Sequence, residues 1–449
     1  MHRTTVQVAI VGGGVAGLEA ARVLHASGVE LIVLEARERI GGRIFTLHDD
    51  TAAIPIELGA EFVHGAAPEL RQIAHDARAA IYDIGGERWR SSHGTLRRLD
   101  DFWQQLDAVM QRLNAKRDPD RSFEQFLNSR PGGARLAHAR SLALQWVEGF
   151  HAADPARVSE RALADGGSPG DDVRERRLGR FLQGYDAVPR WIGRDIERVV
   201  RLGAVVSAVR WQPGAISLEL RQPNGESVTA LEARAAIITA PLGVLLARPS
   251  EPGTIIFDPP LNADRVKSEA LRGMEMGAVM RLTLAVREPF WTSERFMRRA
   301  KTQNLDRLTF VHTSDRDFPV WWTPYPVSAP ILVAWTGGTR ARELSSLRDE
   351  QVTDRAIEAL AREFGVTRRE ARRLVTGSWI HNWENDPYAR GAYSYMLVGG
   401  SDAPAKLARP IDRTLFFAGE ASDSEGRTGT VHGAIATGRR AAKQLLRVL

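Results

Sequence analysis

The first apolar segment of the chain, residues 6–11, is short and continuous, a pattern that predicts a buried β-strand. It runs into a glycine-rich turn at 12–17 and then into a helix at 18–25, where apolar residues recur at helical spacing. A second apolar strand follows at 30–34. Strand, turn, helix and strand in this order form a βαβ unit, which predicts an α/β protein with a Rossmann-type domain.

The remainder of the chain changes from a helical pattern to strand patterns and back. Residues 68–190 are rich in helix formers with charged and apolar residues mixed, so we expect a mostly helical insertion there. The predicted strands cover 199–211, 216–221, 235–240, 277–286 and 331–335, and a final helix covers 435–446. No internal repeat is visible, which excludes a solenoid or propeller.

Length and composition indicate a globular protein with more than one domain. A chain of 449 residues is too long for one ordinary domain, and we expect two intertwined domains. Hydrophobic residues make up 43% and charged residues 26%, the balance of a folded globular chain. No apolar run reaches the roughly 18 to 20 residues of a membrane-spanning helix, and the N-terminus lacks the pattern of a secretory signal. We therefore expect a cytoplasmic protein without a membrane span.

The absence of cysteine and the positive charge narrow the chemistry further. With no cysteine, the chain has no disulfide, no thiolate metal site and no thioether to a cofactor, and we expect no metal. The formal net charge is +6, and basic surfaces can attract nucleic acid. Because the basic residues are scattered along the sequence rather than clustered, we do not expect nucleic acid as a partner.

The glycine-rich turn has the spacing G-x-G-x-x-G between a strand and a helix, the context in which it indicates dinucleotide binding. Gly12 allows the tight turn, Gly14 allows a pyrophosphate to approach the helix N-terminus, and Gly17 allows the helix to pack on the strand. Glu35 ends the second strand, where its carboxylate can accept hydrogen bonds from a ribose. This motif alone does not distinguish FAD from a nicotinamide dinucleotide.

Two further glycine-containing segments follow the βαβ unit. Residues 35–43 read EARERIGGR, so arginines flank the glycine pair Gly41-Gly42 and can meet phosphate together with backbone groups. Residues 57–65 read ELGAEFVHG, a turn of small residues that suits the face of a flat ring. These segments extend the predicted dinucleotide site beyond the first motif.

Two motifs near the end of the chain complete the pattern. Residues 383–395 read WENDPYARGAYSY, which places several aromatic residues close together. Residues 415–420 read LFFAGE, and GTVHGA at 429–434 opens the final helix. A strand, a glycine-containing loop and a helix direct the helix N-terminus and its dipole towards a bound cofactor.

These segments, in this order over nearly the whole chain, resemble the flavin amine oxidase family, which includes monoamine oxidases, polyamine oxidases and flavin-dependent histone lysine demethylases. The resemblance implies bound FAD, a small-molecule amine as substrate, and oxygen or another electron acceptor. It implies an FAD-binding domain formed by 1–67, 195–258 and 405–449. The substrate-binding domain, a helical insertion plus a β-sheet, is formed by 68–194 and 259–404.

The resemblance also assigns a set of residues to the cofactor, with Val206 offering its backbone to the adenine. Ala392 lies where monoamine oxidases carry the cysteine bonded to FAD, so non-covalent FAD is expected. The full set of cofactor-binding residues is Gly12, Gly14, Val15, Ala16, Gly17, Glu35, Ala36, Arg37, Gly41, Gly42, Arg43, Gly59, Ala60, Glu61, Phe62, Val206, Trp383, Tyr388, Gly419, Glu420, Thr430, Val431 and Ala434.

Four residues are candidates for the catalytic face. By the resemblance, Tyr393 and Thr430 form a cage that steers the amine onto the flavin, and threonine in place of a second tyrosine is similar to the polyamine oxidase and lysine demethylase branch. His64 can bind or protonate an amine or water, or can be structural. Arg281 takes the position of the family's flavin-side lysine, where it can hold a water differently or bind a substrate carboxylate.

We therefore expect oxidation of a primary or secondary amine, with a polyamine-like substrate favoured, to an imine that hydrolyses to an aldehyde or ketone. Glu61 can attract a cationic substrate or be satisfied by FAD or backbone donors. The enzymatic alternative is an L-amino-acid oxidase or dehydrogenase, which Arg281 can favour. The non-enzymatic alternative is a weakly catalytic flavin-binding interaction protein. The sequence leaves the amine, the acceptor and the oligomeric state open.

Overall fold

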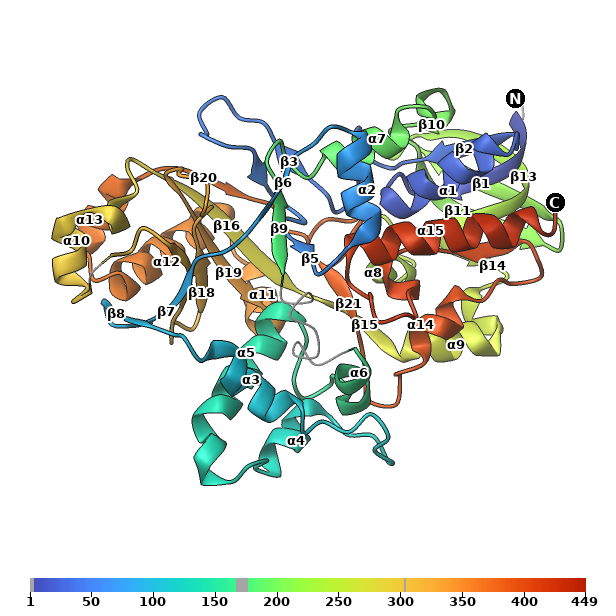
Figure 1. Cartoon of the computed structure of the whole chain (residues 1–449). Coiled ribbons are helices and arrows are strands. Elements are labelled where there is room, and N and C mark those ends of the chain that lie inside the picture. The colour runs from blue at the N-terminus through green and yellow to red at the C-terminus, as the bar shows by residue number, and fades with distance from the viewer. Residues whose placement is uncertain (1–3, 167–176, 303) are drawn as a thin grey trace.

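The computed structural model describes residues 4–166, 177–302 and 304–449 (Figure 1). Two large β-sheets stand at opposite ends of the described molecule, and a group of helices lies below and between them. Both chain termini lie at the end that holds the first sheet. The predicted α/β class is confirmed, because helices and strands are mixed along the whole described chain.

The first sheet has eight strands in the order β10-β2-β1-β13-β12-β11-β14, with β22 pairing with β13. Strand β1 pairs in parallel with β2 and β13, whereas β11, β12 and β13 form antiparallel pairs. Residues Val8 and Ile10 of β1 are fully buried, and so is Ala9 between them, because both faces of this sheet are covered. The strands are β1 Thr4–Val11, β2 Leu31–Leu34, β10 Val200–Arg201, β11 Val205–Gln212, β12 Ala215–Arg221, β13 Ser227–Ile238, β14 Ile256–Asp258 and β22 Leu415–Phe417.

Two helices, α1 (Val15–Ala26) and α15 (Val431–Leu446), pack against each other over this sheet. A Cβ atom on Gly438 would lie only 2.3 Å from the carbonyl oxygen of Ala16, so glycine permits the close contact. Likewise, a Cβ atom on Gly17 would lie 2.0 Å from the carbonyl oxygen of Gly12. The packing places the N-termini of both helices at the carboxyl ends of β1 and β22, where α/β proteins bind ligands.

The second sheet has seven strands in the order β20-β16-β19-β18-β17-β7-β8. Helix α12 (Asp349–Glu363) belongs to the core on one face, and aromatic residues line the opposite face. All pairs are antiparallel except β17 with β7. The strands are β7 Glu87–Ser92, β8 Thr95–Arg98, β16 Val279–Val286, β17 Leu308–His312, β18 Val320–Trp322, β19 Ile331–Gly337 and β20 Val375–Ile380.

The expectation of a mostly helical insertion over 68–190 is only partly right. The hairpin of β7 and β8 lies in this region and extends the second sheet, because it buries alternate residues such as Trp89 and Ser91. His93 and Gly94 form its two-residue turn, both with positive φ, which is the geometry of a tight hairpin. The charged residues between the buried positions concealed the strand pattern. The region also contains α2 Pro68–Asp76, β6 Ile81–Asp83, α3 Phe102–Met110, α4 Phe123–Asn128, α5 Ala137–Phe150, α6 Glu160–Asp165, β9 Leu178–Phe181 and α7 Ala187–Gly193.

The strand predicted over 199–211 is in fact two strands, β10 and β11, since the chain turns at Gly203, where φ is 62°. The segment predicted over 277–286 is likewise divided between β15 and β16. The other elements are β3 Thr46–Leu47, β4 Ile56–Glu57, β5 Val63–His64, α8 Leu242–Leu245, α9 Arg265–Arg272, β15 Met274–Gly277, α10 Glu294–Arg299, α11 Gly338–Ser345, α13 Arg368–Leu374, β21 Tyr393–Met396 and α14 Ala403–Ala408.

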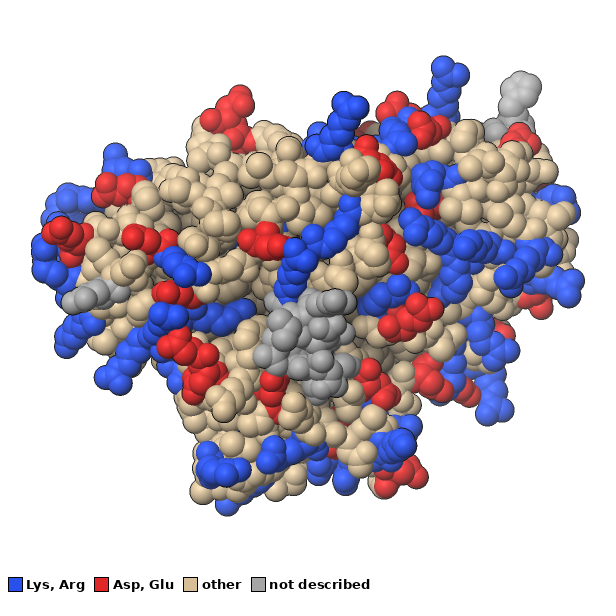
Figure 2. Space-filling view, viewed as in Figure 1, with Lys and Arg blue, Asp and Glu red and all other residues tan. Residues whose placement is uncertain are grey.

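We propose the domain division given above for this structure too. The strands of the first sheet fall within 4–67, 195–258 and 405–449, whereas those of the second sheet fall within 68–194 and 259–404. Acidic and basic side chains are interspersed over the face shown in Figure 2. Of the helices in the described part of the chain, none is both long enough and apolar enough to span a membrane.

Candidate active site

A cavity of about 850 Å³ connects the first sheet, the second sheet and the helices between them. One end is formed by the β1–α1 turn and β11 of the first sheet. The other end is formed by β7 and β17 of the second sheet together with α3 and α5. A volume of this size suits a large cofactor and a small substrate side by side.

The carboxylate of Glu35 closes the glycine-rich turn at the first end. Its Oε2 accepts a hydrogen bond from the backbone N–H of Gly13 at 2.6 Å, and its Oε1 accepts one from that of Arg37 at 3.0 Å. Glu35 is only 3% exposed. Because a carboxylate has about four acceptor sites, it retains the capacity to accept ribose hydroxyls as well.

The glycines keep the backbone accessible where a phosphate would bind. Gly12 has φ of 108°, and a Cβ atom there would meet the Thr239 hydroxyl oxygen at 2.5 Å. A Cβ atom on Gly42 would lie 3.3 Å from the Cα atom of Gly14, so the two glycine segments approach each other at the N-terminus of α1. This arrangement lets backbone N–H groups approach an anion.

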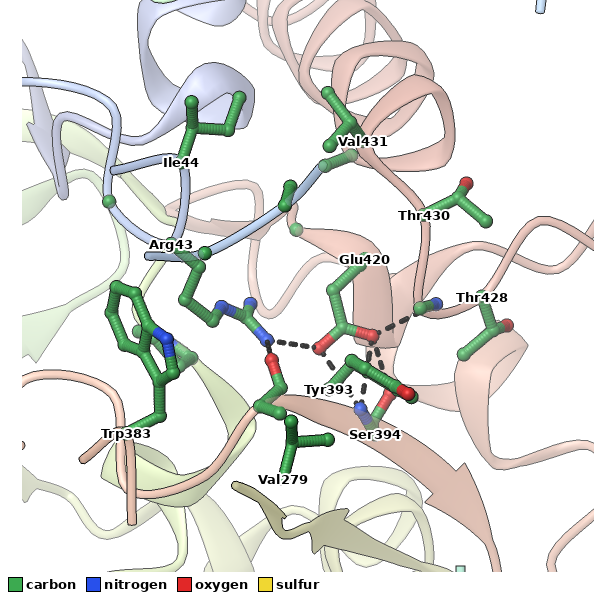
Figure 3. A pocket seen from close by; sticks show the side chains of 18 of the residues that line it. Arg43, Ile44, Val279, Trp383, Tyr393, Ser394, Glu420, Thr428, Thr430 and Val431 are labelled. Carbon is green, nitrogen blue, oxygen red and sulfur yellow. Dashed lines mark hydrogen bonds and ion pairs between the residues drawn. The ribbon is translucent and has the colours of Figure 1, made fainter. Parts of the chain in front are cut away.

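Glu420 is held by three neighbouring groups in the middle of the cavity (Figure 3). Its Oε1 accepts from the Arg43 guanidinium at 2.8 Å, and its Oε2 accepts from the Ser394 hydroxyl at 2.7 Å and the Gly429 backbone at 3.1 Å. Arg43 also donates to the carbonyl oxygen of Ala392 at 2.7 Å. The network joins three segments that are far apart in sequence, which fixes the walls of the cavity.

A second ion pair supports the part of the cavity wall that contains Trp383 and Tyr388. Arg37 donates to the carboxylate of Asp386 at 2.6 Å and lies 5.4 Å from the centre of the Tyr388 ring. The hydrogen bonds from His381 and Arg37 hold the pKa of Asp386 below its usual range despite its burial. Trp383, 4% exposed, donates from its indole to the carbonyl oxygen of Leu58 at 2.8 Å. These contacts fix the Trp383 and Tyr388 rings in the cavity wall.

Thr430 begins helix α15 and directs the N-terminus of this helix to the cavity. Its hydroxyl accepts from the backbone N–H of Gly433 at 3.0 Å and donates to the carbonyl oxygen of Arg427 at 2.7 Å. The helix cap therefore uses the hydroxyl's proton and one of its two acceptor positions. Val431 and Ala434 in the first turn of α15 also line the cavity.

These features together fit FAD. The cavity passes continuously from the Glu35 carboxylate and Val206, past the N-termini of α1 and α15, to the aromatic wall of Trp383. The first part suits an adenosine, the helix N-termini suit the pyrophosphate, and the wall suits a flat ring.

The structure brings nearly all the predicted site residues together. Every predicted cofactor-binding residue except Gly17 lines the cavity. Gly17 instead lies where α1 packs closely on the end of β1, which is the role that the sequence predicted for it. The predicted catalytic residues Tyr393, Thr430, Arg281 and His64 line the same cavity. Their functional roles remain predictions.

Tyr393 and His64 lie on either side of Phe150. The Tyr393 hydroxyl donates to the carbonyl oxygen of Phe150 at 2.7 Å, and burial raises the pKa of this phenol. The His64 ring meets the Phe150 ring edge to face at 5.5 Å. Burial, together with the nearby His432, lowers the pKa of His64 to about 4. At neutral pH His64 is therefore uncharged, so it can accept or donate a hydrogen bond but does not supply a proton.

Glu61 is the centre of a buried charge cluster that includes Arg281. One carboxylate oxygen pairs with Arg281 at 2.9 Å and the other with Arg180 at 2.6 Å, and the Trp322 indole lies 3.2 Å from both. Arg281 also donates to the carbonyl oxygen of Glu57. Two arginines therefore occupy the Glu61 carboxylate, and Arg281 is held by this ion pair and by the Glu57 carbonyl oxygen.

Sequence reading did not single out the residues at the far end of the cavity. All but Gln145 are aromatic or basic, and they come from β7, α3, α5, β17 and β19. None of them was assigned a role from the sequence, because they come from segments that are far apart in the chain. The residues are Arg88, Phe102, Trp103, Gln145, Trp146, Phe150, Phe310, His312 and Trp335.

The fold and the cavity are those of a dinucleotide-binding protein in which a second sheet completes the cavity. The chain belongs to the family of flavin containing amine oxidoreductases, whose family model matches residues 15–446. The predicted family, the flavin cofactor and the prediction that the chain is an enzyme are thereby confirmed.

Individual relatives agree with this placement. Polyamine oxidase 2 of Arabidopsis thaliana is 28% identical over all of this chain and 90% of its own length. Lysine-specific histone demethylase 2 of Homo sapiens is 24% identical over 98% of this chain and 53% of its own length. A putrescine oxidase structure with bound putrescine has a TM-score of 0.78 at 21% identity, covering 99% of this chain and all of that one. Cyclohexylamine oxidase from Brevibacterium oxydans has a TM-score of 0.78 at 19% identity, covering 98% and 99%.

Proposed function

We propose that this enzyme oxidises the C–N bond of a primary or secondary amine to an imine, which water then hydrolyses to an aldehyde or ketone. In the reaction the carbon beside the nitrogen loses a hydride equivalent and the nitrogen loses a proton, so that a C=N double bond forms between them. FAD, when bound, accepts the two electrons. Oxygen or another acceptor takes them up afterwards.

The observation that carries this proposal is that the cofactor part of the cavity continues, past Tyr393, into a far end lined by aromatic side chains. The Tyr393 phenol is fixed by its hydrogen bond to Phe150, and the His64 imidazole, whose ring also contacts Phe150, is uncharged. Two fixed, uncharged side chains favour a neutral amine, the form whose nitrogen lone pair is free. The chain itself therefore contributes mainly orientation and exclusion of water.

The names of the relatives favour a polyamine-like substrate, and the cavity lining continues past Tyr393 to residues of the second sheet. The alternative of an α-amino acid rested on Arg281 as a carboxylate anchor. Because Arg281 is already paired with Glu61, this support is weaker than it was from the sequence. A weakly catalytic interaction protein is not proposed, since the family is one of enzymes.

The proposal is tested by an anaerobic screen of the FAD-loaded enzyme against alkylamines, secondary amines, diamines, polyamines and L-amino acids. We expect the oxidised flavin absorbance to disappear with at least one class of amine and to return when an acceptor is admitted. A flavin that stays oxidised with every amine, while dithionite still reduces it, would overturn the proposed function.

A further inference from the structure

The far end of the cavity contains a cation that the proposed cofactor and cage do not use. Arg88 lies on strand β7 and lines the cavity. Its guanidinium stands 4.4 Å from the centre of the Phe310 ring and 4.7 Å from that of Phe102. The Trp103 ring is 5.1 Å away. Three aromatic faces therefore hold one cation in a fixed place, open to the cavity.

Arg88 differs from the other cavity arginines in its lack of an acidic partner. Within the described residues, no carboxylate lies within ion-pair distance of its guanidinium, although Arg37, Arg43, Arg281 and Arg427 each have one. Burial lowers the pKa of Arg88 to about 10, so it still carries its charge at neutral pH. Aromatic contacts offset part of the desolvation of such a charge, but an anion would compensate it far better.

The carboxylates of the cavity wall are not available to balance a second cation. The described lining contains four of them, and each is paired with an arginine: Glu35 with Arg37, Glu61 with Arg281 and Arg180, Glu69 with Arg427, and Glu420 with Arg43. A distal ammonium group would therefore meet Arg88 without a compensating charge. Like charges in a poorly solvated site repel strongly.

The residues beside Arg88 are uncharged, and two of them have buried nitrogens without a hydrogen-bond partner among the described residues. His312, 9% exposed, stacks on the Phe102 ring at 4.8 Å, and its Nε2 has no hydrogen-bond partner in the described structure. Burial and then Arg88 lower the pKa of His312 to about 3, so the ring is neutral and can donate from one nitrogen. The indole N–H of Trp146, also without a partner among the described residues, lines the same chamber.

A row of aromatic side chains lines the cavity between the cage at Tyr393 and Arg88. Tyr393 contacts Phe150, whose ring stacks on that of Trp146 at 4.3 Å. The Trp146 ring meets that of Phe102 at 6.0 Å, and Phe102 in turn lies under Arg88. A carboxylate on the oxidised carbon itself, as in an α-amino acid, would thus be several rings away from Arg88. A carboxylate at the far end of an apolar chain can reach it.

We propose that the substrate is an amine with a carboxylate at the end remote from the oxidised C–N bond, in place of the polyamine that the names of the relatives favour, and that Arg88 binds this carboxylate. The inference rests on the proposed function, since it takes the reacting amine to lie at Tyr393. Arg88 acts as a specificity-determining residue, with the apolar chain between lying along Phe150, Trp146 and Phe102.

The test compares straight-chain ω-amino carboxylic acids with alkylamines and α,ω-diamines of the same length, by anaerobic flavin reduction in the holoenzyme. We expect the amino acids to have the lowest Kd beyond a minimum chain length and the diamines the highest. Arg88→Gln should raise the Kd of the best amino acid roughly 10 to 100-fold, the loss of a charge-assisted hydrogen bond. It should change the Kd of the matching alkylamine much less than that of the amino acid, because the alkylamine has no carboxylate, and Arg88→Lys should keep part of the preference.

Arg90→Gln is the matched control, because Arg90 lies on the same strand, contacts His138 and does not line the cavity. A second readout does not need turnover: straight-chain carboxylic acids without an amine should raise the melting temperature of the parent and of Arg90→Gln, but not that of Arg88→Gln. If diamines bind best, or if Arg88→Gln weakens alkylamines and amino acids equally, the inference is wrong. An enzyme that binds these acids through Arg88 but is reduced by no amine would instead contradict the proposed function.

Discussion

The Glu61 cluster offers a quantitative test of the site, through the change Glu61→Gln. Gln has the shape of Glu but not its charge, so the guanidinium groups of Arg281 and Arg180 lose their shared counter-ion. Their side chains are 7% and 6% exposed, and that of Glu61 is 11% exposed, so water compensates little. Removing one partner of such a buried pair costs about 3 to 5 kcal/mol.

For 449 residues, this loss corresponds to a fall in melting temperature of roughly 3 to 5 °C, from the usual unfolding entropy per residue. The measurement is thermal unfolding of the FAD-loaded variant, followed by circular dichroism and by release of flavin fluorescence. Glu69→Gln is the matched control, because its pair with Arg427 has a longer distance of 3.4 Å and side chains 15% and 26% exposed. We expect this control to lose about 1 kcal/mol or less. Equal melting temperatures for the parent and Glu61→Gln would refute the reasoning that Glu61 neutralises a buried cluster.

Further predictions concern the cofactor, the cage, the reoxidation step and pH. Because residue 392 is alanine and the chain has no cysteine, FAD should leave intact when the protein is denatured, and yellow colour in the precipitate would contradict this. Tyr393→Ala should slow flavin reduction by the best amine roughly 10 to 100-fold, as expected for lost positioning, without a matching loss of FAD content; an unchanged rate would remove Tyr393 from the cage. With Arg281 present, the reduced flavin should react slowly with oxygen compared with its reaction with an artificial acceptor. Arg281→Lys should speed the reaction of the reduced flavin with oxygen without speeding flavin reduction by the amine, as measured by stopped flow. Burial lowers the pKa of His64 and of His151 to about 4. Because these imidazoles take up protons below about pH 6.5 in the unfolded chain but not in the folded one, the free energy of unfolding should fall between about pH 6.5 and pH 4. A free energy of unfolding in urea that stays constant over this pH range would count against buried neutral imidazoles.

Local patterns in the sequence were sufficient for the cofactor side of the protein. The motif of Gly12, Gly14 and Gly17 works through backbone geometry, which one short segment encodes by itself. The same holds for Glu420 and the start of α15, where a strand, a turn and a helix follow each other directly. For such segments the ligand-facing groups are neighbours in sequence, so a pattern can be read without the fold.

The substrate side could not be read in this way, because its geometry comes from contacts between distant segments. Arg281 looked like a free cation in the sequence, and only the fold brings Glu61 to it. Arg88 lies on a strand hidden in a charged segment that we expected to be helical, and its aromatic neighbours come from α3 and β17. The charge of each arginine was visible from the start, whereas its partners were not.

The central claim is that this enzyme takes two electrons from the carbon beside an amine nitrogen. It is tested most directly by a single anaerobic turnover of the FAD-loaded enzyme with its best amine, in which bleached flavin and released carbonyl product are both counted. The account predicts one aldehyde or ketone for each flavin reduced, together with one molecule of ammonia or of the shortened amine. Flavin bleaching without a carbonyl product, or a carbonyl product without flavin bleaching, would contradict it.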